Sequence, residues 1–275
     1  MKKFSILSWA VTLLVMIAAT PQAQSLYPVF FTGSLPLPIF NWKTCGDMAS
    51  STLCSPSSST SVLDSSGNGN NGTWHGTQSG TTNWYSAATN LLPYAGYFNG
   101  TDNYISGGSS SNINVSTSFT IAAWVNLAST QPQSYPEIFG NYSSTESYYM
   151  LYYNNASNYA GCGRTTSSTW NWIEAGPAIK GSWHFIACVY NSITHVQNFY
   201  VDGVLGAVHG SSLTNWGPVD TPASNDLEVG GRPMISASKQ WMAGPANSIC
   251  LYPVAFTPAQ VVMLCKTTEG SLTNC

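Results

Sequence analysis

Two tryptophans that lie close together in this 275-residue chain could bind a sugar. Trp170 and Trp172 are two residues apart, so their indole rings would share one face of a strand. In sugar-binding sites, aromatic faces cover the apolar side of a pyranose, while asparagine, aspartate or backbone groups bind its hydroxyls. The tryptophans that we expect at loops or strand ends, available for such contacts, are Trp74, Trp170, Trp172, Trp216 and Trp241. For each of them the alternative is a place in the core, where large aromatic residues are common.

A pair of carboxylates could instead hydrolyse a glycosidic bond. Such catalysis needs two carboxylates about 5 Å apart in a retaining enzyme, or about 6.5–9.5 Å apart in an inverting one. Asp226 and Glu228 are the pair with usable spacing, because residues two apart in a strand point to the same face. Arg232 is close in sequence, which favours a surface ion pair for Glu228 over catalysis. The four histidines have no metal-type spacing, and no Gly-x-Ser-x-Gly motif occurs, so we predict that the protein is not an enzyme.

Charged side chains make up only 7% of the residues, far below the typical ~25%. Aromatic residues make up 13%, which argues for a folded domain because disordered chains lack aromatics. The chain has 8 basic and 11 acidic residues, so removal of Lys2 and Lys3 would leave 6 against 11, a net charge of −5. Without a basic cluster to meet phosphates, we predict no nucleic-acid partner.

Residues 1–25 have the pattern of a secretory signal peptide. Lys2 and Lys3 precede an almost uninterrupted apolar run, and small residues follow at Ala19, Ala23 and Ser25. An uncleaved membrane anchor is the alternative, but the run is short for a span of ~20 residues. No other segment is apolar enough to cross a bilayer. We therefore expect a secreted or cell-surface protein with no membrane insertion after signal cleavage.

Seven cysteines in an exported protein indicate disulfides, with one thiol left over. The pairings that position suggests are Cys45–Cys54, Cys162–Cys188 and Cys250–Cys265. Sequence alone does not fix connectivity, so these pairs are hypotheses. For Cys188 the alternative is a small buried apolar residue. Cys275 would then be unpaired or bonded to another chain.

The elements that must position these residues are mostly strands. Residues 26–61, rich in proline and serine, are expected to form an irregular lead-in or linker. Residues 62–275 alternate short strands with turn signals about every ten residues, which is typical of an all-β domain. Residues 119–127 alternate strictly and place Trp124 on the face opposite the apolar residues. Thr257 and Gln260 form a capping box ahead of a short C-terminal helix.

Six segments, taken in order along the chain, carry the motifs of one domain family. They are the loop 64–72, the hairpin 97–105, the strand 118–125, the strand and hairpin 181–205 with its Trp-His and Tyr-Val-Asp-Gly motifs, the strand 227–232 and the closing strand 242–252. Together they resemble a laminin G-like domain of the concanavalin A-like lectin/glucanase superfamily. The resemblance implies an all-β, two-sheet antiparallel jelly-roll sandwich with a short C-terminal helix. The Glu-x-Asp-x-x-Glu run of the superfamily's glucanases does not occur.

The resemblance also implies a calcium site. In this family the opening aspartate loop and an acidic residue at the start of the closing strand commonly hold Ca²⁺, which takes six to eight oxygen ligands. Asp64, Asn68 and Asn70 would supply the loop oxygens, and Asn247 stands where an acid would be usual. The alternative is that Asp64 only caps a turn through its side chain.

The sequence therefore predicts a secreted, non-catalytic binding module that recognises carbohydrate or an extracellular protein, with possible help from calcium. One alternative is a self-associating structural subunit of a surface layer or extracellular fibre, since few charges mean little repulsion between copies. A glycoside hydrolase is the third possibility and depends on Asp226 and Glu228.

Overall fold

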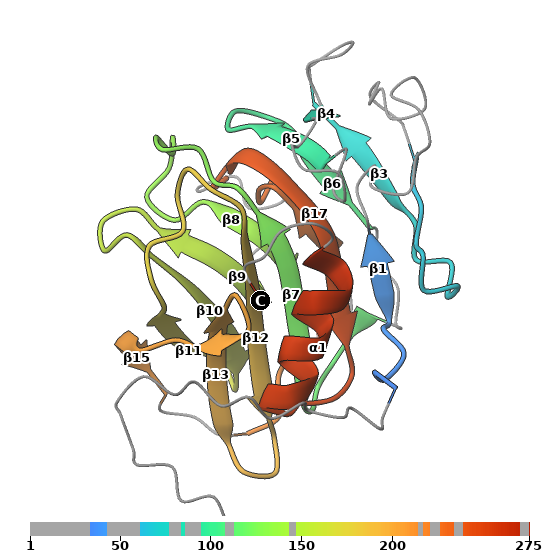
Figure 1. Cartoon of the computed structure of the whole chain (residues 1–275), viewed down its shortest axis with the longest axis vertical. Helices are drawn as coiled ribbons and strands as arrows, with labels where there is room; N and C mark the ends of the chain where they lie inside the picture. The colour runs from blue at the N-terminus through green and yellow to red at the C-terminus, as the bar shows by residue number, and fades with distance from the viewer. Residues whose placement is uncertain are drawn as a thin grey trace, which may run out of the picture. The chain divides into compact units, whose positions relative to one another are not determined.

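In the part of the chain that the structure describes, two antiparallel sheets pack face to face, and one helix lies on the outside (Figure 1). The computed structural model describes residues 34–42, 61–76, 84–85, 95–107, 113–142, 147–213, 217–220, 226–233, 239–269 and 275. The eight-stranded sheet runs in the order β14 (Val204–Leu205), β13 (Val196–Val201), β12 (His184–Asn191), β7 (Phe119–Val125), β17 (Ala243–Tyr252), β5 (Ala95–Asn99) and β4 (Trp84–Tyr85), and β1 (Phe40–Trp42) also pairs with β17. The nine-stranded sheet runs in the order β15 (Val208–Ser212), β11 (Thr169–Ala175), β10 (Tyr159–Thr166), β9 (Ser147–Asn154), β8 (Glu137–Tyr142), β16 (Asp226–Val229), β6 (Tyr104–Ser106), β3 (Gly72–His75) and β2 (Ser61–Val62). The predicted two-sheet sandwich is confirmed.

The main hydrophobic core lies between the two sheets and is built from alternate residues of their strands. Phe119 and Ile121 of β7 and Tyr149 and Leu151 of β9 belong to it, and each is at most 1% exposed. The rings of Phe119 and Tyr149 come from opposite sheets, with centroids 5.6 Å apart. The alternation predicted for residues 119–127 is therefore confirmed, because a strand side chain can reach the core only at every second position.

The helix α1 (Pro258–Glu269) covers the outer face of the eight-stranded sheet (Figure 1). It starts at the predicted capping box: the Thr257 amide donates to Gln260 Oε1 at 2.9 Å, and the Gln260 amide donates to Thr257 Oγ1 at 3.3 Å. Trp124, on the face opposite the main core, is fully buried beneath the helix and donates its indole N–H to Thr268 Oγ1 at 2.9 Å. The cover that Trp124 needs thus comes from α1.

The sandwich begins earlier in the chain than residue 62. Phe40 and Trp42 of β1 are fully buried, and β1 pairs with β17 in a register that places Phe40 opposite Leu251. The description of 26–61 as an irregular lead-in is therefore corrected for this segment: a three-residue strand between prolines and a serine-rich stretch carries too little periodicity to be recognised. The predicted signal peptide and most of the predicted lead-in lie outside the described residues.

Two disulfides tie the described part of the chain. Cys162 of β10 bonds to Cys188 of β12, so the predicted pair joins the two sheets. The predicted bridge between Cys250 and Cys265 is wrong: Cys265 bonds to Cys275, and Cys250 is a buried free thiol under the Ala122 carbonyl. Spacing misled here because Cys250, Cys265 and Cys275 all lie in or against one hydrophobic cluster, so position along the chain does not single out the partner of Cys265. Cys45 and Cys54 lie outside the described residues.

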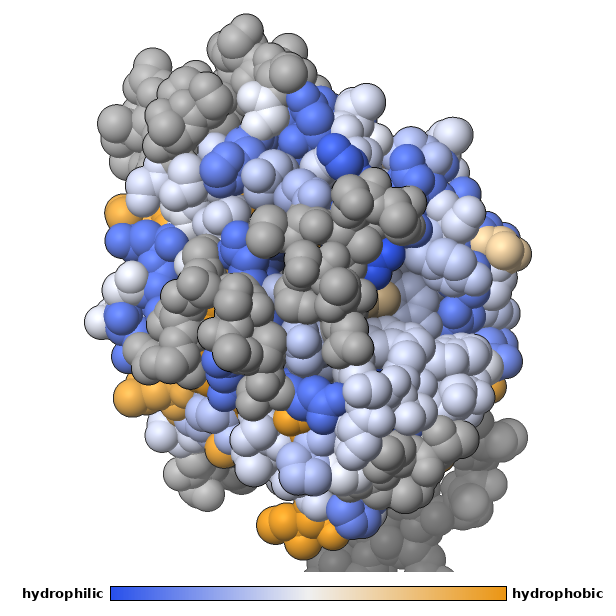
Figure 2. All heavy atoms as spheres, turned by 180° about the vertical axis from the view of Figure 1, so that it is seen from behind, coloured by the Kyte–Doolittle hydropathy of each residue, from blue (hydrophilic) through white to orange (hydrophobic). Residues whose placement is uncertain are grey.

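The surface is polar without being highly charged. On the face that Figure 2 shows, the described surface is mostly blue and white, with orange confined to small separate patches. Within the described ranges, no helix is long and apolar enough to span a bilayer.

Candidate functional site

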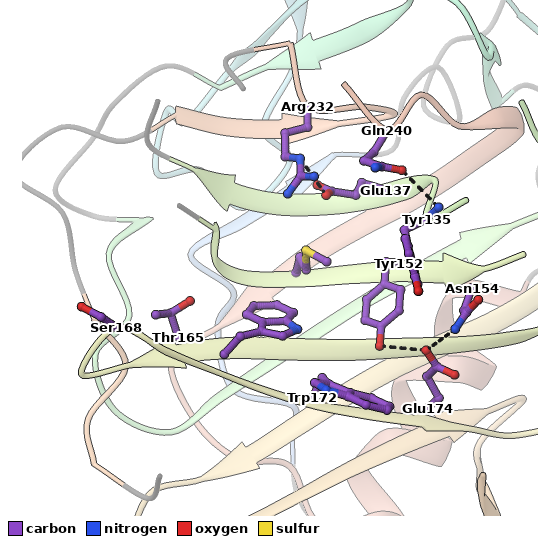
Figure 3. Close-up of a pocket in the computed structure, with 12 residues that line it drawn as sticks. Tyr135, Glu137, Tyr152, Asn154, Thr165, Ser168, Trp172, Glu174, Arg232 and Gln240 are labelled. Atoms are coloured by element: carbon purple, nitrogen blue, oxygen red, sulfur yellow. Dashed lines mark hydrogen bonds and ion pairs between the residues drawn. The ribbon is translucent and has the colours of Figure 1, made fainter. Parts of the chain in front are cut away.

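A cavity of about 560 Å³ lies on the outer face of the nine-stranded sheet, within the ~300–1,000 Å³ usual for small-molecule sites. Its lining residues come from four neighbouring strands, β8 to β11, and from the segments around residues 135, 168, 232 and 240. They are Tyr135, Glu137, Met150, Tyr152, Asn154, Thr165, Ser168, Trp170, Trp172, Glu174, Arg232 and Gln240 (Figure 3). Trp170 and Trp172, two of the five tryptophans proposed from sequence, are thus brought together.

The strand pleat decides which side chains reach the cavity. Along β9, Tyr149, Leu151 and Tyr153 enter the main core, so Met150 and Tyr152 point to the opposite face. There Met150 and Tyr152 form a small separate cluster with Tyr142 and the half-buried Trp170. Sequence analysis missed Met150 and Tyr152 because the whole run 148–153 is apolar or aromatic, which hides its alternation.

Glycines in β10 make room for the aromatic side chains. Gly163 pairs with Met150 on one side and with Trp172 on the other, and a Cβ at Gly163 would collide with the Trp170 indole. At Gly161 a Cβ would lie 2.9 Å from the Tyr152 ring and 3.0 Å from Glu174 Cγ. Because Gly161 and Gly163 have no side chains, aromatic rings can lie directly against the β10 backbone at these two positions.

Glu174 provides a fixed polar group at one side of the cavity. Its Oε1 accepts hydrogen bonds from Asn154 Nδ2 at 2.7 Å and from the Tyr152 hydroxyl at 3.3 Å, and its Oε2 accepts one from the Ser157 hydroxyl at 2.9 Å. The side chain is 6% exposed and lines the cavity. Three donors hold the carboxylate in one orientation, so its remaining acceptor capacity is directed for a ligand hydroxyl.

Arg232 and Glu137 form an ion pair at the opposite side, with Arg232 Nε 3.0 Å from Glu137 Oε1 (Figure 3). Burial raises the pKa of Glu137 to about 7, although the Arg232 charge opposes this shift. Gln240 ties the neighbouring segment: its Oε1 accepts the Tyr135 amide at 3.1 Å, and its backbone carbonyl accepts the Glu137 amide at 2.9 Å. Tyr135, 46% exposed, stands at the rim.

The two glutamates of the cavity stand on strands that are not direct neighbours. Glu137 pairs with Tyr152, Tyr152 with Gly161, and Gly161 with Glu174, which places three strand spacings between the two glutamates. At ~4.8 Å per strand spacing, the backbones of the two glutamates are about 14 Å apart across the sheet. Figure 3 shows the two carboxylates on opposite sides of the aromatic floor, the part of the cavity lined by Tyr152, Trp170 and Trp172.

The pair proposed from sequence, Asp226 and Glu228, shares a face as predicted but does not line the cavity. The predicted surface ion pair of Glu228 is wrong, because its side chain is only 1% exposed. Burial first, and then the charges of Asp226 and Glu137, raise the pKa of Glu228 to about 9. Glu228 therefore stays protonated at neutral pH.

The other tryptophans proposed from sequence do not join the cavity. Trp74 is 3% exposed and packs in the main core against Phe98, with ring centroids 5.0 Å apart. Trp241 is 8% exposed, lies beside Tyr104 and fills the space that a Cβ on Gly231 would need. Both indoles serve packing, which corrects their assignment as ligand contacts. Trp216 lies outside the described residues.

The loop proposed for calcium is held by its own hydrogen bonds. Asp64 Oδ1 accepts the amides of Asn41 and Ser66, each at 2.9 Å, while Oδ2 accepts the Ser66 hydroxyl at 2.7 Å and the Asn70 amide at 3.0 Å. The side-chain amides of Asn68 and Asn70 donate to the Ile39 carbonyl at 3.0 and 2.8 Å.

Asn247, on β17, is fully buried, and its Oδ1 accepts the Ser248 amide at 2.6 Å. In this arrangement the Asp64 carboxylate and Asn247 Oδ1 each accept hydrogen bonds from protein donors. Calcium binding stays a prediction, and the geometry fits Asp64 as a loop cap that also anchors β1.

Replacing Asp64 with asparagine tests the two roles. As a cap, the change puts an amide N–H₂ opposite the donors of Ser66 and Asn70, and we expect a loss of about 1–3 kcal/mol of stability. Thermal melting of wild type and D64N, each with calcium and with chelator, is the measurement. We expect a lower Tm for the variant and no effect of chelator on either protein. A wild-type Tm that rises with calcium, and does so less in the variant, would restore the calcium site.

A family model described as the concanavalin A-like lectin/glucanases superfamily, of laminin G type, matches residues 99–262, more than half of the chain. The chain belongs to this superfamily. No curated protein matches the sequence.

Solved structures of the same fold are distant in sequence. Domain 4 of AbnA, an extracellular GH43 arabinanase from Geobacillus stearothermophilus in complex with arabinotriose, has 17% identity and a TM-score of 0.55, over 84% of this chain and 100% of that one. The binding domain of botulinum neurotoxin serotype G has 13% identity and a TM-score of 0.58 over 84% of this chain. The serotype D binding domain, in complex with N-acetylneuraminic acid, has 9% identity and a TM-score of 0.56 over the same share. The chain spans about half the length of the two neurotoxin domains, and at these identities the likeness concerns the fold alone.

Proposed function

We propose that this protein is a secreted, non-catalytic module that binds carbohydrate in the cavity on the nine-stranded sheet. The observation that carries the proposal is the combination of Trp170 and Trp172 with the fixed acceptor Glu174 in one cavity. Indole faces suit the apolar side of a sugar ring, and a preorganised carboxylate suits its hydroxyls. Superfamily membership and the likeness to a domain solved with arabinotriose support a carbohydrate ligand.

Export is part of this proposal. The signal-like residues 1–25 and the disulfides Cys162–Cys188 and Cys265–Cys275 support it, since disulfides persist in oxidising compartments. The structural-subunit alternative is less well supported than it was from sequence, because Cys275 bonds within its own chain and does not link copies covalently.

Truncation of Trp172 is the direct test. A glycan array with the purified protein should identify an oligosaccharide ligand, and calorimetric titration should give its affinity. We expect W172A to bind that ligand about fivefold to tenfold more weakly, because aromatic contacts contribute about 1–1.5 kcal/mol and 1.4 kcal/mol is a factor of ten.

The matched control is Y97A, which removes a half-buried aromatic ring from β5 of the other sheet and should leave the affinity unchanged. Failure of every glycan to bind, or equal affinity of W172A and wild type, would contradict the proposal.

A further inference from the structure

The charged groups around the cavity are mostly acidic. Glu137 and Glu174 line it, whereas Arg232 is the one basic residue in the lining that the structure describes. At the end of the cavity beyond Ser168, Asp220 adds a third carboxylate, which accepts the amides of Ser167 and Ser168 at 2.8 Å each.

The positive charge of Arg232 is largely balanced by the Glu137 carboxylate within the cavity. Its Nε lies 3.0 Å from Glu137 Oε1, and the Glu137 side chain is 99% buried, so this carboxylate has little solvent around it other than the cavity. Lys239 adds a cation at the rim, where its backbone carbonyl accepts the Arg232 amide and its ammonium stands 6.0 Å from the Trp241 ring. Being exposed, this ammonium is screened by solvent.

Glu174 is the charge that a ligand meets directly. All three of its contacts, with Tyr152, Asn154 and Ser157, donate to the carboxylate. None of these donors carries a positive charge, so the hydrogen bonds orient the carboxylate without neutralising it. A ligand hydroxyl or ammonium can donate to Glu174, whereas a ligand carboxylate placed beside it would be repelled in a partly buried site.

We infer that the cavity selects uncharged sugars and rejects sugars that carry a carboxylate or sulfate. This inference rests on the proposed function and narrows it to a substrate class. The aromatic floor favours any pyranose or furanose ring, so the discrimination comes from Glu174 and Glu137 at the two sides. We expect a neutral oligosaccharide to bind at least tenfold more tightly than the same oligosaccharide oxidised at C6 to a uronate.

The experiment compares matched pairs of oligosaccharides, each neutral member with its C6-uronate, by calorimetric titration at pH 8, above the pKa of about 7 of Glu137. The variants E174Q and E137Q should each narrow the neutral-to-acidic affinity ratio, even if they weaken both affinities. D202N is the control: it removes an equal charge beside His184, in the eight-stranded sheet, and should leave the ratio unchanged. Raising the salt concentration should narrow the ratio of neutral to acidic affinity for the wild type, and this measurement requires no variant.

The outcomes separate the two proposals. If no oligosaccharide of either kind binds, the proposed function itself is wrong. If uronates bind as tightly as their neutral partners, carbohydrate binding stands and the charge selection is overturned. If neutral sugars bind better but neither glutamate variant nor salt changes the ratio, the selection does not come from these carboxylates, and the inference fails.

Discussion

Replacing Cys162 and Cys188 together with alanine is expected to lower the free energy of unfolding by about 3.5 kcal/mol, the chain-entropy value for a bridge that closes a loop of 26 residues. The bridge joins β10 to β12 and so holds the two sheets together within the main core. Both sulfurs are fully buried, so the variant also loses packing, which adds to the effect. Urea unfolding followed by tryptophan fluorescence is the measurement.

The second bridge provides the comparison. Cys265–Cys275 spans only 10 residues and ties the end of the chain to α1, so C265A/C275A should cost about 2.7 kcal/mol on the same model. A stability of C162A/C188A equal to that of wild type, or wild-type stability that does not change on reduction, would show that the inter-sheet bridge does not form.

Replacing Glu228 with glutamine is expected to stabilise the protein at alkaline pH. The folded-state pKa of about 9 lies above the ordinary value of 4.5, so the carboxyl group is neutral in both states below pH 4.5. As pH rises from 4.5 to 9, the unfolded chain loses this proton while the folded chain keeps it, and stability falls. The glutamine side chain does not ionise in this pH range, so the variant does not lose stability in this way as pH rises.

At about 1.4 kcal/mol per pKa unit, and with allowance for the buried amide that glutamine introduces, we expect E228Q to gain about 2–4 kcal/mol at pH 8 and almost nothing at pH 4. Urea unfolding at pH 4, 6 and 8 measures the difference. E137Q is the matched control. Its gain in stability over wild type should stop growing near pH 7, where the Glu137 carboxyl ionises in the folded state. An E228Q variant no more stable than wild type at pH 8 would mean that Glu228 is ionised in the fold.

The candidate site was only partly predictable. The spacing of Trp170 and Trp172 placed both indoles on one strand face, and they line the cavity. For Trp74 the same argument from residue type was wrong, because a tryptophan in a short strand has equal access to either face until the partner strands are known. Glu174 gave no sequence signal at all, since its role depends on Asn154 and Ser157, which approach it only through the pairing of β9, β10 and β11.

By itself the sequence determined the class of fold and several local structural features. Alternation over 119–127, the capping box at Thr257 and the ordered motifs of the laminin G-like family are local patterns, and local patterns are set by neighbours along the chain. Only the tertiary structure decided the partner of Cys265, the burial of Glu228 and the packing of the Trp170 indole against Gly163. Each of these depends on which distant strand or helix lies alongside, and sheet pairing brings together residues whose separation in sequence carries no periodic signal.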